Sequence, residues 1–184
     1  MDQPQKYHKH IRLQGNNYRQ GAYFVTLCSL QRQELFGRIV GNGTDALMEL
    51  TDSGRIVDEC WRAIPDHFPH ARLDQTQIMP DHLHGILVLA PVRPVQQPIG
   101  STQWVDATGA PNEVSGRPRG PVPGSLSAII AAYKSETTKR INRLNGISGQ
   151  PFWQPGYFER ATRQQGGEYG RIAQYIAENT ANWR

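Results

Sequence analysis

Two histidines one residue apart open the most apolar run of this chain and constrain its fold more than any other feature. His82 and His84 begin a stretch rich in Ile, Leu and Val that ends near residue 89, and Pro80 and Asp81 precede it. The run predicts a buried strand that follows a turn. Because side chains alternate between the two faces of a strand, the histidines share one face, about 6–7 Å apart.

Two imidazoles on one strand face admit two interpretations. Neutral imidazole is the commonest metal ligand, and at this spacing both rings can reach one ion. Alternatively, the rings are buried polar groups that need hydrogen-bond partners in the core. Ile86 and Val88 continue the histidine face, and the opposite face carries only Leu and Gly, so the strand is predicted to be buried on both sides. The pattern alone leaves both interpretations open.

Length and composition favour a single domain over residues 1–184. The chain is 38% hydrophobic, enough for one sizeable core. Residues 91–124 are rich in Pro and Gly without periodicity, and predict an inserted mobile loop. No apolar window approaches the ~18 residues of a membrane span, and residues 1–15 lack the apolar segment of a secretion signal. Cys28 and Cys60 match no metal-ligand spacing, and Cys28 fits a small core residue. We therefore expect a cytoplasmic protein with no membrane partner.

The basic residues are clustered. The formal net charge is +4 at pH 7, a mild excess that permits nucleic-acid binding. Positive side chains gather in the N-terminal arm, on one predicted helix and near the C-terminus, and three clusters together favour a phosphate-bearing partner. The candidate DNA contacts among them are Lys9, Arg12, Lys134, Lys139, Arg140 and Arg163.

Hydrophobic periodicity predicts the element order β-α-β-β-α-β-α. The expected strands cover residues 21–28, 71–79, 82–89 and part of 152–160, and the expected helices cover about 53–64, 125–144 and 167–179. This order is typical of an α+β fold with a ferredoxin-like or RRM-like antiparallel sheet, and two helices are expected on one of its faces.

The last predicted helix carries a tyrosine and an asparagine one turn apart. Tyr175 and Asn179 are at positions i and i+4, so they are neighbours on one helical face. A phenol can act as a covalent nucleophile, and an amide oxygen one turn away can ligate a metal or orient a phosphate. Ile172 and Ile176 beside the tyrosine also fit an ordinary packing stripe. From these residues alone, the packing interpretation is favoured.

Five short segments follow one another along the chain. They are GAYFVT at 21–26, MPDHLHG at 79–85, YKS at 133–135, FWQPGY at 152–157 and YIAEN at 175–179. With these segments in this order, the chain resembles the single-tyrosine HUH (His-hydrophobic-His) transposases of the insertion-sequence type, especially the REP-associated tyrosine transposase family. The resemblance covers nearly the whole chain outside the 91–124 insertion. It implies a ferredoxin-like fold with the histidine strand central in the sheet.

The same resemblance implies an activity: metal-dependent nicking and strand transfer of single-stranded DNA through a 5′-phosphotyrosine. By position, His82 and His84 match the metal pair, Tyr175 the nucleophile, and Asn179 a polar residue implicated in metal binding. The implied cofactor is Mg²⁺ or Mn²⁺, and the implied partner is single-stranded DNA with hairpin or repeat elements. A homodimer and a domesticated role on chromosomal repeats are left open. Relatives often have a proline directly after the asparagine, where this chain has Thr180. Without that proline, the helix can continue past Asn179.

Two other function classes are compatible with parts of this pattern. A non-catalytic RRM-like nucleic-acid-binding protein would use the same sheet, but RRM proteins present aromatic residues on central strands, where this chain has histidines. The other alternative is a zinc-dependent hydrolase or base deaminase. Deaminases require His-x-Glu with Pro-Cys-x-x-Cys, and the chain has neither motif.

Overall fold

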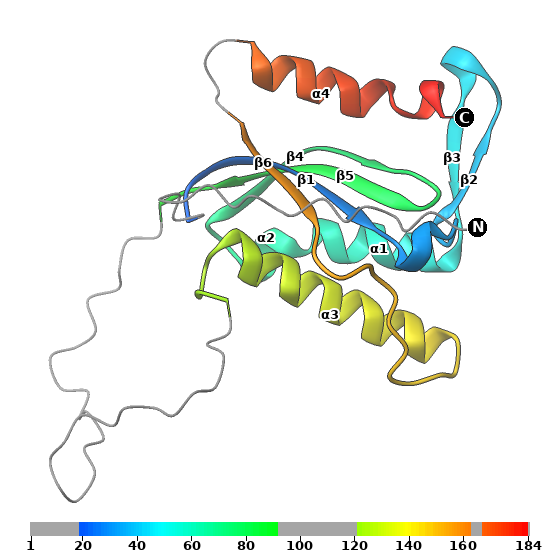
Figure 1. Ribbon diagram of the computed structural model, residues 1–184, viewed down its shortest axis with the longest axis horizontal. Helices are drawn as coiled ribbons and strands as arrows, with labels where there is room; N and C mark the ends of the chain where they lie inside the picture. The colour runs from blue at the N-terminus through cyan, green and yellow to red at the C-terminus, as the bar shows by residue number, and fades with distance from the viewer. Residues whose placement is uncertain (1–18, 92–120, 163–166, 184) are drawn as a thin grey trace, which may run out of the picture.

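A four-stranded antiparallel sheet organises the protein (Figure 1). The computed structural model describes residues 19–91, 121–162 and 167–183. The sheet order is β4-β5-β1-β6, and its strands are β1 (Gly21–Cys28), β4 (Ala71–Ile78), β5 (His82–Leu89) and β6 (Phe158–Thr162). The histidine strand β5 pairs with β1 on one side and with β4 on the other. The predicted ferredoxin-like sheet with a central histidine strand is therefore confirmed.

Helices cover both faces of this sheet. Figure 1 shows α1 (Asp52–Arg62), α2 (Ile64–His67) and α3 (Leu126–Leu144) on one side and α4 (Glu168–Glu178) on the other. The side chains of Thr51 and Ser125 accept hydrogen bonds from backbone N–H groups in the first turns of α1 and α3, as N-cap residues do. The three long helices lie where periodicity predicts them.

Three boundaries differ from the sequence expectation. The first helix ends at Arg62, and Pro65 lies in the first turn of the separate helix α2, where its missing N–H is not needed. Strand β6 begins only at Phe158, because the preceding aromatic segment forms a loop in which Trp153 pairs with Ser29. Helix α4 does not run on past Asn179; a single 3-10 turn, η3 (Thr180–Asn182), follows.

A two-stranded hairpin was not expected from the sequence. Strands β2 (Gly37–Val40) and β3 (Leu47–Leu50) pair with each other, and the short turns η1 (Leu30–Arg32) and η2 (Gly43–Asp45) flank β2. The hairpin strands are short and half exposed, so they lack the apolar alternation that marks a strand. Both β3 and η2 contact η3, so the hairpin supports the C-terminal turn.

The alternation of β1 and β5 divides the core into two clusters. Tyr23, Leu27 and Leu83 face α1 and α3 within the larger cluster. Phe24 and Ile86 face the other way, and pack with Ile176 of α4 in the smaller cluster. The histidine strand is therefore buried on both sides, as predicted. Across the described ranges, no helix combines the length and the apolar character that crossing a bilayer requires.

Gly85 allows α1 to lie close to the histidine strand. A Cβ added at Gly85 would be 2.4 Å from Cζ2 of Trp61, well inside van der Waals contact. Trp61 is 1% exposed, and its indole N–H donates to Thr76 Oγ1 on β4 at 2.8 Å. Because that hydrogen bond and the surrounding core hold the indole in place, it has little room to move away.

Gly85→Ala is expected to destabilise the protein. Overpacking of a filled core costs about 1–3 kcal/mol, and the displaced backbone also carries His84. Gly170→Ala is the matched control, since nothing lies within 4 Å of a Cβ at Gly170 in α4 and alanine favours a helix by about 1 kcal/mol. Urea unfolding measures both changes. Equal stability of the two variants would contradict this packing argument.

Candidate metal and tyrosine site

The two histidines of β5 point their rings at each other beneath α4. His82 and His84 are each 6% exposed. Their Nε2 atoms are 3.0 Å apart, and their ring centroids are 4.4 Å apart. They lie on the face of the sheet that continues with Ile86, as the strand period predicts.

A carboxylate holds the outer nitrogen of the first ring. Nδ1 of His82 is 2.5 Å from Asp81 Oδ1, and the second oxygen of this buried carboxylate is 2.8 Å from Nε of Arg32. Arg32 also donates to Cys28 Sγ at 2.9 Å. Cys28 is only partly buried and lies opposite His82 in the β1–β5 register, so the expectation of a core cysteine was wrong. Its side chain alternates onto the histidine face, which α4 covers incompletely.

A threonine holds the outer nitrogen of the second ring. Thr26 Oγ1 lies 2.8 Å from Nδ1 of His84, and the two residues are direct partners across β1 and β5. One pair of neutral tautomers satisfies every contact. His82 donates from Nδ1 to Asp81, His84 donates from Nε2 to His82, and the Thr26 hydroxyl donates to His84. The two rings are thus hydrogen-bonded to each other, to Asp81 and to Thr26.

Burial keeps both imidazoles neutral. It is the main cause that lowers the pKa of His84 to about 3, and the nearby His82 and Arg32 add to the effect. Burial also lowers the pKa of His82, although the Asp81 carboxylate opposes that shift. Near pH 7 the rings therefore carry lone pairs rather than charge, which is the form that binds metals.

These side chains fit one divalent cation. Their two Nε2 atoms are 3.0 Å apart and would be close enough to ligate one ion together. Asp81 would be the outer carboxylate that commonly orients a ligating histidine. His84 would have to carry its proton on Nδ1 instead, where the Thr26 hydroxyl can accept it.

Asn179, which ends α4 and begins η3, is the sequence candidate for a third ligand. The side-chain nitrogen of Asn179 is buried and has no hydrogen-bond partner in the described structure. The two ends of an amide are interchangeable in such an assignment, so the buried atom without a partner can equally be the Asn179 oxygen, which is the end that would ligate a cation. Within the described residues, no three His, Cys, Asp or Glu side chains gather around one point. An ion here would depend on two imidazoles, this amide and water or phosphate oxygens.

Tyr175 lies beside the histidine pair. Its ring centroid is 5.6 Å from that of His84 and 6.5 Å from that of Phe24. The residue is 53% exposed, and no group in the described structure hydrogen-bonds its hydroxyl. Ile176, fully buried against Phe24 and Ile86, does the packing for this turn of α4 instead. The tyrosine is therefore accessible, and it meets the histidines of its own chain.

Polar contacts hold the start of α4 over the sheet, and an aromatic ring lies against the site just beyond its end. Near its start, the Tyr169 hydroxyl donates to Asp74 of β4, and Glu168 pairs with Arg160 of β6 at 2.5 Å. Beyond its end, the Trp183 ring lies 5.9 Å from that of His82. Tyr175 and Trp183 lie four residues before and four residues after Asn179, and the rings of both lie beside the histidine pair.

The candidate DNA contacts are not gathered at this site. Lys9, Arg12 and Arg163 lie outside the described residues. Lys134, Lys139 and Arg140 are on α3, behind the sheet as seen from the histidines. The Lys134 ammonium donates to the carbonyls of Gln154 and Gly156, and Arg140 pairs with Glu59 at 2.5 Å. A role of these residues in DNA binding stays a prediction, and it would concern DNA on the α3 side.

Sequence reasoning missed the residues that support the histidines. Asp81 directly precedes His82, and this adjacency is a readable signal for an orienting carboxylate. Thr26 could be identified only through the register of β1 against β5. Arg32 gives no signal, because the turn η1 brings it to Asp81 across nearly fifty residues of sequence.

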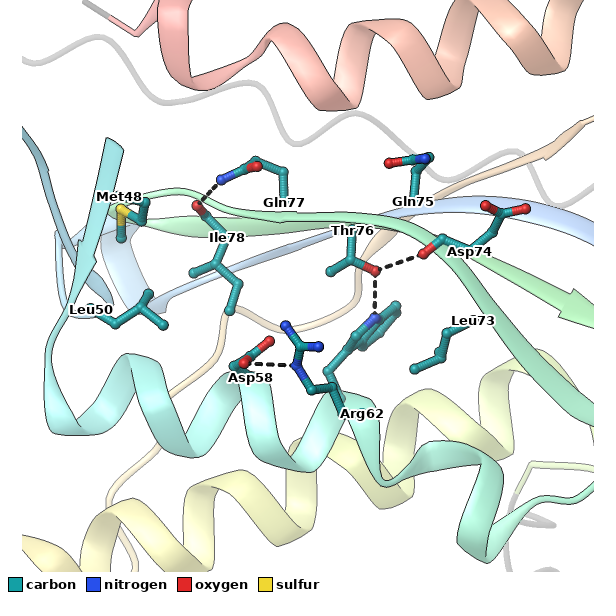
Figure 2. Close-up of a pocket in the computed structure, with 11 residues that line it drawn as sticks. Met48, Leu50, Asp58, Arg62, Leu73, Asp74, Gln75, Thr76, Gln77 and Ile78 are labelled. Atoms are coloured by element: carbon teal, nitrogen blue, oxygen red, sulfur yellow. Dashed lines mark hydrogen bonds and ion pairs between the residues drawn. The ribbon is translucent and has the colours of Figure 1, made fainter. Parts of the chain in front are cut away.

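A separate hollow of about 610 Å³ opens between β4, α1 and β3 (Figure 2). Leu73 and Ile78 point into it from β4, and the Asp58–Arg62 ion pair of α1 lies at its side. Gln75 and Gln77 point to the other side of the sheet in Figure 2, toward α4. The hollow contains neither histidine nor Tyr175, so it is distinct from the site above.

Comparison with known proteins identifies a close sequence relative. An uncharacterized protein of Haemophilus influenzae is 32% identical over 174 residues, which cover 94% of this chain and 88% of that protein. The chain belongs to the same family as this protein. No protein-family model matches the chain.

A solved structure shares the fold. It is described as a REP-associated tyrosine transposase bound to a REP hairpin, and it matches with a TM-score of 0.52 and 15% identity. The match covers 99% of this chain and 74% of that one. The predicted resemblance to REP-associated tyrosine transposases is therefore confirmed for the fold.

The tautomers of the histidine pair are directly measurable. In the metal-free protein at pH 7, long-range ¹H–¹⁵N spectra are expected to show His82 protonated on Nδ1 and His84 on Nε2. His84 should not titrate until the pH falls toward 3, because burial lowers its pKa to about that value. Asp81→Asn should mix the tautomers of His82. A His84 ring that titrates near pH 6.5 in the folded protein would contradict this arrangement.

Lys134→Met is expected to lower stability by about 1–3 kcal/mol, because the 151–157 loop loses its anchor and two carbonyls lose a donor. Lys139→Met is the control, since this exposed lysine of the same helix should contribute within about 0.5 kcal/mol. Burial lowers the pKa of Lys134 to about 8, below the 10.5 of an unfolded chain, so the unfolded state binds more protons between these values. The advantage of the wild type over Lys134→Met should therefore grow from pH 8 to 10.5 in urea titrations. Equal stability of both variants would mean that Lys134 is free to contact DNA.

Proposed function

We propose that this protein is a metal-dependent enzyme that nicks and rejoins single-stranded DNA through a tyrosine, as transposases of the HUH type do. The observation that carries the proposal is the position of Tyr175, an accessible phenol whose ring lies 5.6 Å from that of His84. A nucleophile and two neutral imidazoles thus come together on one face of the sheet. The shared fold with a REP-associated tyrosine transposase supports the same conclusion.

The proposed cofactor is Mg²⁺ or Mn²⁺, held by His82, His84 and Asn179. Two imidazoles favour Mn²⁺ by affinity. When bound, such an ion supplies positive charge that offsets the charge that develops on a phosphate under attack. Asp81 and Thr26 contribute by keeping the two rings turned toward each other.

Tyr175 performs the covalent step in this proposal. Its hydroxyl oxygen forms a bond to phosphorus, and the bond from phosphorus to the 3′ oxygen breaks. Because the residue is 53% exposed, water can accept the phenolic proton, and water can protonate the departing 3′ oxygen. The products are a free 3′ end and a 5′-phosphotyrosine.

A covalent product explains why a tyrosine would serve better than water at this position. Attack by water would end the reaction as hydrolysis. A phosphotyrosine keeps the energy of the broken bond, so a second 3′ hydroxyl can reverse the attack and join a new strand. Strand transfer then needs no additional energy source.

Single-stranded DNA beside a hairpin is the proposed substrate. The support is the structural neighbour, which is described as bound to a REP hairpin. Basic residues would contact phosphates and set the position of the strand.

A non-catalytic, RRM-like nucleic-acid-binding protein is the second candidate. One observation favours it: Phe158, on the edge strand β6, is 50% exposed on the same face as Phe24, and exposed aromatics on a sheet bind bases in RRM proteins. This candidate predicts binding without metal and no covalent product.

Covalent capture separates the two candidates. A pool of labelled, hairpin-containing single strands is incubated with the protein in Mn²⁺ or in EDTA and run on a denaturing gel. A protein–DNA band is expected in Mn²⁺ only, and it should be lost in Tyr175→Phe. Tyr157→Phe is the control, because Tyr157 packs against the core on the α3 side, so the band should persist.

His82→Ala completes the test. It should slow cleavage by about 100-fold or more, since an ion at a reacting phosphate contributes several kcal/mol. DNA affinity should change little, because affinity depends mainly on phosphate contacts. A band that forms in EDTA, or one attached to a tyrosine other than Tyr175, would contradict the proposal.

A further inference from the structure

A second hollow lies between β6 and α4, next to the tyrosine. Its volume is about 420 Å³, within the ~300–1,000 Å³ of small-ligand sites. Its lining comes from both sides of the gap: Phe24, Phe158, Arg160, Glu168, Arg171, Ile172 and Tyr175. Tyr175 is thus shared between this groove and the histidine pair.

Three of the seven residues that line the groove are aromatic: Phe24, Phe158 and Tyr175. Phe24 stacks on His84 with ring centroids 5.3 Å apart, and Phe158 meets Phe24 edge-on at 6.1 Å. The Phe158 side chain is 50% exposed, whereas phenylalanine is among the residues most often fully buried. The exposed ring therefore presents a flat apolar surface, and only Phe24 separates it from His84.

The groove also carries one positive charge without an ionic partner. Arg160 is engaged by Glu168 at 2.5 Å. Arg171 makes no ion pair or side-chain hydrogen bond within the described residues. It precedes Tyr175 by four positions on α4, so the guanidinium and the phenol lie on the same helical face. An anion bound there would be within one helical turn of the nucleophile.

We propose that this groove binds one unpaired nucleobase of single-stranded DNA, stacked on Phe158, with the adjoining phosphate on Arg171. An apolar aromatic surface beside a free arginine matches the two parts of a nucleotide, a π-face and a phosphate. The statement that this nucleotide flanks the phosphate attacked by Tyr175 rests on the proposed function; binding of the base does not. Because a base in duplex DNA is already stacked and paired, the groove would select single strands.

Photocrosslinking tests the location. The probe is an eight-nucleotide oligo(dT) with one 5-iododeoxyuridine, irradiated with the full-length protein in EDTA so that no cleavage is required. The expected crosslink, located by tandem mass spectrometry, is on Phe158. Crosslinks confined to α3, to the 151–157 loop or to other residues outside the groove would overturn the proposal.

Affinity measurements test the energetics with the same oligo(dT) and an abasic strand of equal length. Phe158→Ala should weaken oligo(dT) binding by about 5- to 150-fold, the usual effect of losing one base–aromatic stack, and Phe158→Trp should restore it. Binding of the abasic strand should not change. Leu144→Ala, which removes an equally exposed apolar side chain from α3, should have no effect on either probe.

The arginine has its own readout. Arg171→Gln should reduce the dependence of log affinity on log salt by about 0.7, the value for one phosphate contact on a single strand. If Phe158→Ala lowered the affinity for oligo(dT) and for the abasic strand equally, or left the affinity for oligo(dT) unchanged, the proposal would be overturned. A positive crosslink without any covalent tyrosine adduct would leave the groove proposal intact and contradict the nicking activity. An adduct that is insensitive to Phe158 would do the reverse.

Discussion

The hydrogen bond from His82 to Asp81 is the contact on which the site depends. It fixes the tautomer of His82, and therefore leaves the Nε2 lone pair of this ring facing His84. Arg32 balances the buried carboxylate at 2.8 Å, so the chain of contacts does not leave an unpaired charge inside the protein. Thr26 completes the chain at its other end. Without Asp81, either nitrogen of His82 could carry the proton, and the two rings would lose their common orientation.

The two faces of the sheet carry different features: one holds most of the apolar core, and the other holds the candidate site. The face toward α1 and α3 holds the larger apolar cluster, and Gly85 permits the close approach of Trp61 there. The face toward α4 has a smaller apolar cluster, because polar histidines and an accessible tyrosine occupy part of its area. Helix α4 is consequently held by Ile176 together with polar contacts at Glu168 and Tyr169. Its position sets the distance from Tyr175 to the histidines.

The period of the backbone made the central part of this structure predictable. Alternation alone placed His82 and His84 on one face, and helical spacing placed Tyr175 and Asn179 on one turn. Those rules are local, and they hold because each residue is compared only with neighbours in the chain. The resemblance to HUH transposases added the expectation that strand and helix meet, which no local rule contains.

The features that could not be predicted from the sequence depend on contacts between segments that are far apart in the chain. Arg32 reaches Asp81 only through the turn η1, and the hairpin β2–β3 consists of strands too short and too polar to stand out. Lys134 had the composition of a phosphate contact, yet its ammonium is bound by carbonyls of the loop before β6. A basic side chain on a helix does not reveal whether a loop will cover it. Cys28 was misjudged for a similar reason, since its exposure depends on how far α4 extends over β1.

A manganese-soaked crystal tests the central claim most directly. The account predicts an anomalous-difference peak between the rings, about 2.1 Å from each Nε2 of His82 and His84, with the amide oxygen of Asn179 turned toward it and the Tyr175 hydroxyl on the open side. No peak between the rings at saturating Mn²⁺, with the Nε2 atoms still hydrogen-bonded to each other, would show that the pair is a structural contact rather than a metal site.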